Sequence, residues 1–576
     1  MITLNMESFY RSLLIKSKSN IALLITSIFV GLIVSIVAQL FILSAKNLYQ
    51  YFYNNPENYF IINLFDLNLN ISSILICLLA SLIVCFLIKI KNIDRWHGPA
   101  DTIYAAHQKK GTLDTEKGFL STIAAFVSIS GGASVGIYGP LVHFGGTLGA
   151  FLRRRKYMPI IPHDIIIGSG VAAAISAGFG SPLAGILFAH EVVLRHFSMR
   201  AITAIALSSI TASVVANEIG LVEPPFRFEE ILFDLTSALP GLIFVGFASG
   251  IIGLIFMHGL LLSGKIAKQS GLKNFYNPII PGLLCGIVGC FIPEVLGLGI
   301  TPVLEMITTP NVLTFMVLLL IFKLFLTSLC IGFGLFGGVF SPAIFLGATV
   351  GAIIYHIPFL GINPELQSIF VVGGMAALSS SVIGAPITAI VLILELTGSY
   401  KFAIASIFPI VISTLITYLT FGSSFFDKQL LLRGIFMSFG REHIMLSQQS
   451  IRKYCNNDYI GFDKNITVSE ATKIFKKQKS TEGYFLDKDK KFLGKLRLID
   501  IIEVKKDICY LYREKDPLTI DQKSNVNEVI KTLANFVGES VPIIDKKNNI
   551  LVGIISENDV LNSYSEISSE IRSIEK

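Results

Sequence analysis

The chain has 576 residues, of which 52% are hydrophobic and only 15% are charged. A water-soluble domain carries about 25% charged residues, so this composition excludes a soluble globular protein and predicts several membrane-spanning segments. The net charge of +7 fits basic cytoplasmic loops and gives no reason to expect nucleic acid as a partner. The seven cysteines show no Cys-x-x-Cys spacing, so neither a disulfide framework nor a metal site is expected.

The first apolar segment, residues 21–45, is too long for the apolar core of a signal peptide, which spans about 7–15 residues. We expect a first membrane helix there and a second over residues 72–88. Basic residues before the first helix and after the second predict that both flanks, and with them the N-terminus, are cytoplasmic. An external loop is expected between the helices, over residues 49–70.

From about residue 119 to 419 the chain is apolar but is interrupted by Gly and Pro at short intervals. Many pieces are shorter than the roughly 20 residues that cross a bilayer, which indicates broken or re-entrant helices. After about Met445 the composition changes to Lys, Asp, Asn and Glu alternating with apolar residues, which is typical of a soluble domain. We place the boundary within residues 439–450, between a membrane domain of residues 1–440 and a cytoplasmic domain of residues 446–576.

The apolar segment contains an internal repeat with halves at about residues 118–200 and 318–400. The motif Gly-x-x-x-Pro that begins at Gly136 returns at Gly338, 202 residues later, and the glycine, threonine and alanine positions after it return in the same register. A second stretch, GSPLAGILFAHEVV, returns as GAPITAIVLILELT. The two halves therefore predict two copies of one structural unit.

Paired halves of this kind are typical of transporters, in which the site lies where broken helices meet. A helix that begins inside the membrane points free N–H groups and the positive end of its dipole at the space before it, and such a site selects anions. Gly permits close approach of the backbone, and Pro is tolerated in a first helical turn. The alternative is that these glycines only pack membrane helices together, but two motifs in register favour the anion site.

These motifs resemble those of the CLC family of chloride channels and proton-coupled chloride antiporters, over nearly the whole chain. The clearest matches are GLFGGVFSPAIFLG, SPLAGILFAHE and IGAPITAIVLILELT, while GIYGP, WHGPADTIYAAH and SSFFDKQLLLRG stand where the family has other pore motifs. The resemblance implies an all-α, multi-pass membrane fold with an inverted repeat of broken and re-entrant helices. It also implies a homodimer in the lipid bilayer with one pore per subunit, which transports chloride or another small anion and is not an enzyme.

The positions that carry protons in the family are altered here. Tyr138 stands in place of the gating glutamate, and a phenol, with an ordinary pKa of about 10, stays neutral near pH 7. Glu191 matches the first of two adjacent acidic residues of the antiporters, but Val192 replaces the second, the internal proton-transfer glutamate. We interpret Tyr138 as a neutral gate. The alternative is an aromatic residue that only packs between helices or at the membrane interface.

The anion path is expected to be lined mainly by backbone amides at the starts of the two motif helices. The positions concerned are Ile137, which replaces a basic residue of the family, Tyr138, Gly139, Val339, Phe340 and Ser341. At the inner site His97 falls at or beside the family's serine, and Phe426 replaces a tyrosine whose hydroxyl reaches the same ion. His97 could supply an N–H donor in place of both hydroxyls. The alternative is a histidine that is satisfied by a loop carbonyl.

Other ionisable residues in the apolar segment are functional candidates by default. Glu191 and its repeat counterpart Glu395 are expected to pair with basic side chains or backbone amides, with regulation of protons or anions by Glu191 as the less favoured role. His143 and His190 are weaker candidates for carrying protons. Lys323 is expected to snorkel or to be paired.

The soluble tail has a repeat of its own, in which VSEATKIF returns as VNEVIKTL and GYFLDKDKKFLGKLRLID returns as VPIIDKKNNILVGIISEND. Each unit predicts a short helix, a strand, a turn, a second strand and a closing helix, and this α/β pattern resembles a tandem pair of CBS domains. The resemblance implies a cleft for adenine nucleotides with an Asp preceded by Ser or Thr. Asp559 with Ser556 fits, whereas Asp500 has Arg497 instead. No cofactor is required, because a purely structural dimerisation module is an equal alternative.

The sequence therefore predicts a passive, proton-uncoupled chloride conductor. The runner-up is a proton-coupled antiporter whose protons travel by His97, Glu191 or water. A third hypothesis is a non-conducting membrane sensor in which Tyr138 plugs the pore and the CBS pair binds a nucleotide.

Overall fold

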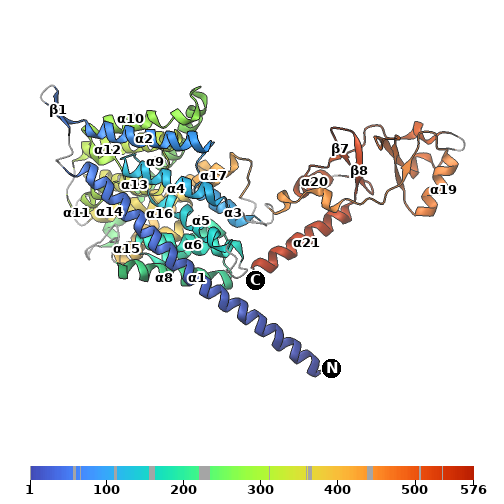
Figure 1. Ribbon diagram of the computed structural model, residues 1–576, viewed down its shortest axis with the longest axis horizontal. Coiled ribbons are helices and arrows are strands. Elements are labelled where there is room, and N and C mark those ends of the chain that lie inside the picture. Colours follow the sequence, from blue (N-terminus) through green and yellow to red (C-terminus); the bar gives the residue numbers. More distant parts are fainter. Residues whose placement is uncertain are drawn as a thin grey trace. The chain divides into compact units, whose positions relative to one another are not determined.

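The computed structural model of the protein describes residues 2–55, 60–64, 67–108, 113–154, 162–219, 234–309, 312–358, 360, 366–437, 445–504, 507–534 and 536–575, with side chains masked at residues 2–20, 61–69, 570 and 572–575. Two compact units divide the chain, Met1–Gly434 and Ile435–Lys576. The first unit is a bundle of helices of unequal length (Figure 1). The predicted boundary at residues 439–450 lies partly outside the described residues.

The helices of the first unit follow one another with short connections. They are α1 (Ile2–Tyr53), α2 (Ser72–Lys91), α3 (Pro99–His107), α4 (Thr115–Ser130), α5 (Tyr138–Arg153), α6 (His163–Phe179), α7 (Pro182–Phe188), the π-helix η2 (Ala189–Leu194), α8 (Met199–Ile219), α9 (Leu235–Gln269), α10 (Ile279–Phe291), α11 (Ile300–Thr308), α12 (Leu313–Gly332), α13 (Phe340–Tyr355), α14 (Leu366–Ile383), α15 (Pro386–Thr397), α16 (Tyr400–Phe421) and α17 (Phe425–Leu431). Short 3₁₀ turns at Asn274–Tyr276 (η3) and Pro293–Val295 (η4) flank α10.

Eight helical segments of the described residues are long and apolar enough to cross a membrane. They are Ile21–Tyr53, Ser72–Lys91, Met199–Ile219, Leu235–Gln269, Asn274–Phe291, Leu313–Gly332, Leu366–Ile383 and Tyr400–Leu431. Between them lie shorter apolar helices that cannot span a bilayer alone, including α6, α13 and α15. The protein is therefore a multi-pass membrane protein, and the first unit is its membrane unit.

The segment predicted as a loop over residues 49–70 is more ordered than expected. Helix α1 continues to Tyr53 because the rings of Tyr49 and Tyr53, one turn apart, stack at 4.7 Å and the Tyr53 hydroxyl donates to the carbonyl of Gly131 at 3.0 Å. Farther on, strands β1 (Ile61–Leu64) and β2 (Leu67–Asn70) pair as an antiparallel hairpin. Only part of the predicted loop is thus free of regular structure.

The two repeat halves pack their helices in the same way. Helix α5 packs on α6, and α13 packs on α14. A Cβ atom added at Gly145 would lie 2.3 Å from the carbonyl oxygen of Gly170, and one added at Gly347 would lie 2.1 Å from that of Gly374. Glycine is therefore required in both halves for the backbones to touch.

Each half then turns sharply into its next helix. Gly180 ends α6 with φ of 69°, and Gly384 follows α14 with φ of 76°, a left-handed conformation that favours glycine. Helices α7 and α15 start directly afterwards, each with Pro in its first turn. In the first half the helix continues as η2, a π-helix, whereas α15 stays regular.

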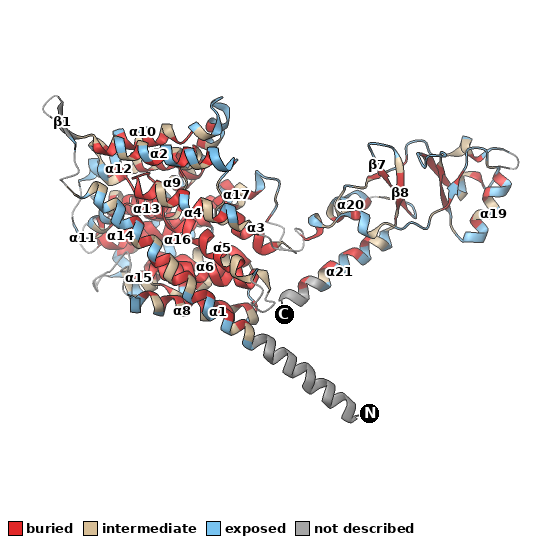
Figure 2. Ribbon diagram, in the orientation of Figure 1, coloured by how far each residue is buried: buried red, intermediate tan, exposed pale blue. Residues whose placement is uncertain are grey.

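The core of the membrane unit lies at its four repeat helices. Figure 2 shows the contrast between these buried helices and the outer ones, which expose apolar side chains. All 18 residues of Leu366–Ile383 are buried, whereas the outer spans bury 39–44% of their residues. The outer faces suit a lipid environment, and the repeat helices form the protein interior.

The C-terminal unit consists of two small sheets with the same order and direction of strands. The first sheet is β3 (Gly461–Phe462), β4 (Glu482–Leu486) and β5 (Phe492–Arg497); the second is β6 (Ile520–Asp521), β7 (Val541–Asp545) and β8 (Ile550–Ile555). The first pair of strands in each sheet is parallel and the second is antiparallel. Helices α19 (Val468–Gln478), α20 (Val526–Leu533) and α21 (Glu557–Glu575) complete the unit.

One predicted element of this unit is wrong. The first repeat closes with a 3₁₀ turn, η6 (Leu498–Ile501), instead of an α-helix. In the second repeat Ser556 and Asp559 cap the start of α21, because the Ser556 hydroxyl accepts from the Asp559 N–H at 3.3 Å. Arg497 stands at the matching position and cannot accept from an N–H, so the first repeat lacks this cap.

Candidate functional site

The helices α5 and α13 begin against each other at the centre of the membrane unit. Gly136 and Gly338 exchange two backbone hydrogen bonds, with N···O distances of 2.8 and 2.6 Å. A Cβ atom added at Gly139 would lie 2.6 Å from the Cα of Gly338. The repeated glycines thus bring together the two helix N-termini that the sequence predicts to face an anion.

The first turns of these helices hold the predicted amide donors. The first bonds within the helices run from Leu141 N to Ile137 O at 3.1 Å and from Ala343 N to Val339 O at 3.0 Å. By helix geometry, the N–H groups ahead of these bonds have no partner inside the helix. The N–H of Ile137 donates to the Ser341 hydroxyl at 3.3 Å, so this amide is occupied by a side chain of the other half.

Tyr138 lies in a cluster of three aromatic rings. Its ring is 6% exposed and stacks on Phe179 with centroids 3.6 Å apart and planes at 17°. Phe340 lies edge-on to both rings, at 5.8 Å from Tyr138 and 5.4 Å from Phe179. Phe179 was missed by the sequence reasoning, although it directly precedes Gly180 of the repeated stretch, a position that brings α6 to its end at the site.

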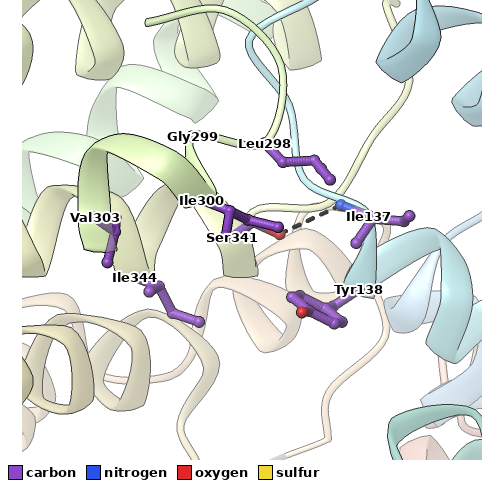
Figure 3. Close-up of a pocket in the computed structure, with 8 residues that line it drawn as sticks. All are labelled: Ile137, Tyr138, Leu298, Gly299, Ile300, Val303, Ser341 and Ile344. Carbon is purple, nitrogen blue, oxygen red and sulfur yellow. Dashed lines mark hydrogen bonds between the residues drawn. The ribbon is translucent and has the colours of Figure 1, made fainter. Parts of the chain in front are cut away.

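A small cavity lies beside Tyr138 (Figure 3). It is lined by Ile137, Tyr138, Leu298, Gly299, Ile300, Val303, Ser341 and Ile344. Its free space is about 10 Å³, which is roughly one water-sized sphere. A chloride ion is larger than water, so passage through this point requires the Tyr138 ring or its neighbours to move.

The two repeat glutamates cap each other's helices. The Glu191 carboxylate accepts from Ile387 N at 3.0 Å, Thr388 N at 2.7 Å and the Thr388 hydroxyl at 2.6 Å, at the start of α15. The Glu395 carboxylate accepts from two backbone N–H groups at the start of α7, Leu183 and Ala184, both at 2.8 Å. A carboxylate at a helix N-terminus stabilises it through hydrogen bonds and the helix dipole. Both glutamates therefore join the halves at a distance from the aromatic cluster.

The other predicted proton position, Val192, is buried in the π-helix η2 and has no titratable group. Arg195, at the end of η2, pairs with Asp427 on α17 and not with Glu191. Single-turn π-helices are frequent at functional sites. Here the π-helix places Glu191 toward α15.

The inner region is built around α3 and the loop before it. The backbone N–H of His97 donates to Ser121 Oγ at 2.9 Å, and its ring lies edge-on to that of His143, with centroids 6.2 Å apart. No loop carbonyl satisfies Nδ1 of His97 among the described residues. Phe426 is buried on α17, which packs against α3. The segments that carry His97 and Phe426 are thus neighbours.

A charged cluster lies on the same helix. The Asp101 carboxylate accepts two hydrogen bonds from Arg95, at 2.6 and 2.9 Å, and one from Arg433, at 2.9 Å. Two guanidinium groups against one carboxylate leave a net positive charge, which favours anions in the surroundings. Arg433 directly precedes the end of the membrane unit at Gly434.

Lys323 does not snorkel. Its side chain is fully buried in α12, and its ammonium donates to the carbonyls of Val295 and Gly297, both at 2.9 Å, below the ring of Phe345 at 5.0 Å. The segment it holds continues into Leu298, Gly299 and Ile300, which line the cavity beside Tyr138. Lys323 therefore orders one wall of that cavity.

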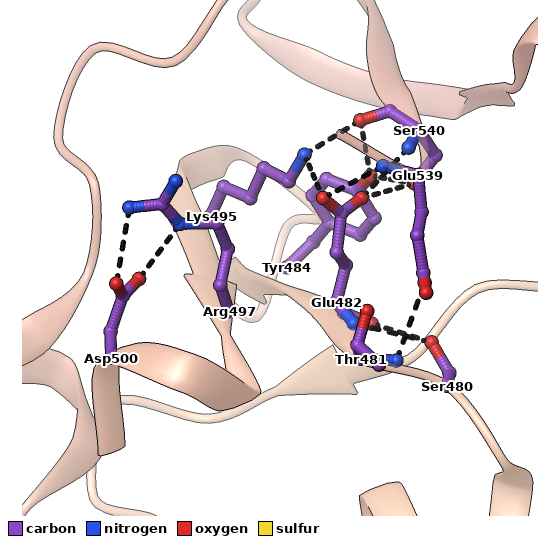
Figure 4. Close-up of polar contacts among 9 residues, drawn as sticks. All are labelled: Ser480, Thr481, Glu482, Tyr484, Lys495, Arg497, Asp500, Glu539 and Ser540. Atoms are coloured by element: carbon purple, nitrogen blue, oxygen red, sulfur yellow. Dashed lines mark hydrogen bonds and ion pairs between the residues drawn. The ribbon is translucent and has the colours of Figure 1, made fainter. Parts of the chain in front are cut away.

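The predicted nucleotide-site residues of the C-terminal unit differ in their surroundings. Asp500 is paired through both carboxylate oxygens with Arg497, at 3.0 and 3.1 Å (Figure 4). Asp559 uses one oxygen, Oδ2, to accept from the N–H and hydroxyl of Ser556 at 2.9 and 2.7 Å. The carboxylate of Asp500 is thus occupied by a cation, while Asp559 keeps its second oxygen for another donor.

A buried ion pair joins the two repeats of this unit. Lys495 and Glu482 are 3% and 5% exposed, and their charged atoms are 2.7 Å apart. Glu482 also accepts from the N–H and hydroxyl of Ser540, both at 2.8 Å, and Lys495 donates to the Ser540 carbonyl at 2.7 Å (Figure 4). Burial raises the pKa of Tyr484, so its phenol stays protonated at 2.6 Å from Ser540 Oγ. The network was not foreseen from the sequence, because it depends on contacts between the repeats.

Comparisons with known proteins place this architecture. The family described as voltage gated chloride channel matches residues 76–418, and the CBS domain family matches residues 510–566. The slow cyanobacterial Cl⁻/H⁺ antiporter has a similar solved structure, with a TM-score of 0.63 and 21% identity over 72% of this chain and 98% of that one. A eukaryotic CLC transporter matches with a TM-score of 0.60 and 15% identity over 94% of this chain and 98% of that one. At these identities the structural matches establish the fold alone.

Curated relatives have both channel and exchanger names. A putative chloride channel protein, ClcB-like, from Ralstonia nicotianae is 28% identical over 56% of this chain and 76% of that protein. The H⁺/Cl⁻ exchange transporter ClcA of Vibrio parahaemolyticus is 28% identical over 50% of this chain and 63% of its own. Chloride channel protein CLC-e of Arabidopsis thaliana is 30% identical over 52% of this chain and 46% of its own. The match thus spans less than two thirds of the exchanger and of the plant protein.

The family match covers more than half of the chain and includes the helices that meet at Tyr138. The repeated C-terminal sheets include the segment that matches the CBS family. The chain therefore belongs to the voltage gated chloride channel family, the CLC family, and carries a CBS domain in its C-terminal unit.

Proposed function

We propose that the protein is a passive, proton-uncoupled chloride conductor in which Tyr138 is a neutral gate. The observation that carries the proposal is the stacking of Tyr138 on Phe179 where α5 and α13 begin against each other. In this arrangement an aromatic side chain stands at the meeting point of two helix N-termini, where an anion is favoured. Rotation of the ring off Phe179 would open the path.

Chloride as the substrate rests on the family and on the names of the relatives, several of which are chloride channels or exchangers. The physical arrangement supports an anion in general. Backbone N–H groups of two helices converge, and the Arg95–Asp101–Arg433 cluster adds positive charge near the inner region. Nitrate or another small anion would satisfy the same donors.

Three features support transport without protons. A tyrosine at the gate stays neutral near pH 7, since an ordinary phenol has a pKa of about 10. Val192 has no titratable group. The Glu191 carboxylate is engaged in three hydrogen bonds at the start of α15, so proton transfer by this residue would have to break a helix cap.

Proton-coupled exchange is the second candidate function. It is favoured by the exchanger among the relatives and by the buried histidines His97 and His143, which have ring nitrogens without partners among the described residues. A non-conducting sensor is the third candidate, and the small volume of the cavity beside Tyr138 favours it.

Assembly, orientation and ligand of the C-terminal unit are part of the same proposal. A homodimer with one pore per subunit and a cytoplasmic N-terminus and CBS unit follow from the family and from the basic flanks of the first helices. The residues fit an adenine nucleotide only in the second repeat, where Asp559 keeps a free carboxylate oxygen for a ribose hydroxyl. Arg497 fills that role at Asp500, so the first repeat does not fit.

The test is flux from liposomes that hold the purified protein under a chloride gradient, with chloride efflux and external pH recorded together. Valinomycin with potassium releases the membrane potential. We expect chloride efflux that needs valinomycin and moves no protons uphill, and Tyr138→Phe, which keeps the ring and removes the hydroxyl, serves as the matched variant. Uphill proton movement would establish the exchanger, and absence of any flux would establish the sensor.

A further inference from the structure

Two buried imidazole nitrogens near α3 have no hydrogen-bond partner among the described residues, Nδ1 of His97 and Nε2 of His143. The two rings contact each other edge to face, with centroids 6.2 Å apart and planes at 65°. His143 is completely buried on α5. Polar atoms in a protein interior are nearly always paired, because leaving them unpaired is costly, so two such atoms on contacting rings indicate a ligand.

The other nitrogen of His143 fixes the proton. Nδ1 of His143 lies 2.7 Å from the hydroxyl of Thr102, which is also fully buried. A neutral imidazole has one donor and one acceptor nitrogen. If the Thr102 hydroxyl donates to Nδ1, its proton is satisfied and Nε2 carries the hydrogen; the reverse arrangement leaves the hydroxyl proton without an acceptor among the described residues. His143 therefore presents an N–H donor at Nε2.

The surroundings favour an anion as the acceptor. Asp101 is the acidic group nearest in the chain to His97 on α3, and its carboxylate is engaged by both Arg95 and Arg433. The remaining charge of this cluster is positive. Helix α3 begins at Pro99, directly after His97 and Gly98, so the positive end of its dipole faces the same region.

Resting on the proposed function, we propose that His97 and His143 together bind a small monovalent anion at the inner end of the path through their ring N–H groups. Thr102 is a positioning residue that holds the His143 ring in the donating tautomer. The pair replaces the serine and tyrosine hydroxyls that the family resemblance implies for the inner site, since Phe426 has no donor. His143 is thus a determinant of anion affinity, rather than a proton carrier.

The experiment is chloride binding to the purified full-length protein in detergent, followed by isothermal titration calorimetry for the wild type and four variants. His143→Leu removes the donor, and His143→Gln keeps an N–H group near the position of Nε2. Thr102→Val removes the hydroxyl with little change in shape. His258→Leu is the matched control, because His258 is an exposed histidine of the membrane unit, on α9, whose Nδ1 contacts the Leu254 carbonyl at 2.9 Å.

We expect chloride affinity about tenfold lower in His143→Leu, from the loss of a hydrogen bond to a charged group. Thr102→Val should bind about threefold more weakly by the same reasoning, while His143→Gln and His258→Leu stay near the wild type. Equal affinity in the wild type and His143→Leu would overturn the inference and leave the proposed function intact. If His143→Leu does not fold, unchanged affinity in Thr102→Val would overturn it.

Proton measurements in liposomes separate the two proposals. A wild type that binds no chloride and conducts none would contradict the proposed function. A wild type that moves protons uphill, with this movement lost in His143→Leu while chloride affinity is kept, would make the histidine a proton carrier and overturn the inference. Chloride flux without protons, reduced by His143→Leu at low chloride and recovered at high chloride, supports both.

Discussion

The two repeat halves of the membrane unit agree in their scaffold and differ in the side chains at the site. Gly145 contacts Gly170 as Gly347 contacts Gly374, and the caps by Glu191 and Glu395 are reciprocal. At the meeting point, however, α5 contributes Tyr138 and α13 contributes Phe340. The comparison teaches that the glycines and glutamates set where the helices begin, while the aromatic residues determine what can pass.

The asymmetry extends to the helix that follows each half. The first half has the π-helix η2, and the second half has a regular helix at the same place. The first half also holds the buried His143, two turns into α5, whereas the matching position in α13 is Phe345 under Lys323. Polar groups are thus concentrated in the first half, and the second half is more apolar.

The largest effect is expected from filling the helix contacts. Gly145→Ala and Gly347→Ala each place a Cβ within 2.3 Å of a backbone carbonyl oxygen that cannot move aside. Overpacking ordinarily costs about 1–3 kcal/mol, and here it should exceed that range and abolish the folded protein in both cases. The measurement is the yield of monodisperse protein by size-exclusion chromatography. Gly264→Ala, which has open space, is the control, and normal yield of only one of the two variants would contradict the equivalence of the halves.

The next largest effect concerns the two repeats of the CBS unit. Lys495→Met leaves Glu482 buried without its cation, a change that costs about 3–5 kcal/mol. We expect faster hydrogen exchange in strands β4 and β7, measured by mass spectrometry on the full chain. The double variant Glu482→Gln/Lys495→Met should lose less. Protection equal to the wild type in Lys495→Met would show that the pair does not hold the repeats together.

A smaller effect is expected from the reciprocal caps. Glu191→Gln and Glu395→Gln each remove a charge at a helix N-terminus and should cost about 1–2 kcal/mol. Glu191 accepts three hydrogen bonds and Glu395 two, so the first variant should lower the thermal unfolding midpoint more. Glu116→Gln, in an exposed pair with Lys91, is the control and should change little. The opposite ranking of the two cap variants would be evidence against this account of the caps.

The smallest effect in energy is expected at the gate. Tyr138→Ala removes the ring that stacks on Phe179, an interaction worth about 0.5–1.5 kcal/mol. Chloride efflux from liposomes should therefore rise about two- to tenfold. Tyr138→Phe keeps the stacking and should conduct like the wild type. A fall in efflux after Tyr138→Ala would mean that the ring supports the path instead of closing it.

Much of the fold could be predicted from the sequence because the signals are local and repeated. Glycine at Gly136 and Gly338, with proline four residues later, marks helices that start inside the protein. The change of composition near Met445 separates the two kinds of solvent. The extension of α1 to Tyr53 was not predicted, since it depends on a hydrogen bond to Gly131, 78 residues away.

The site was less accessible to sequence reasoning. Phe179 has no polar atom and no motif of its own, and its role follows only from the stacking with Tyr138. The direction of Glu191 depends on the π-helix, which brings it to the start of α15 on the other half of the chain. Tertiary contacts of this length leave no periodic pattern. The residues proposed to bind the anion stay predictions until their variants are measured.

The most direct measurement of the central claim is the reversal potential of the current in planar bilayers that contain the wild-type protein. A chloride gradient is held fixed while a pH gradient is imposed across the membrane. A passive chloride conductor predicts a reversal potential that stays at the chloride equilibrium potential whatever the pH gradient. A shift of the reversal potential with the pH gradient would show that protons are carried together with chloride and would contradict the account.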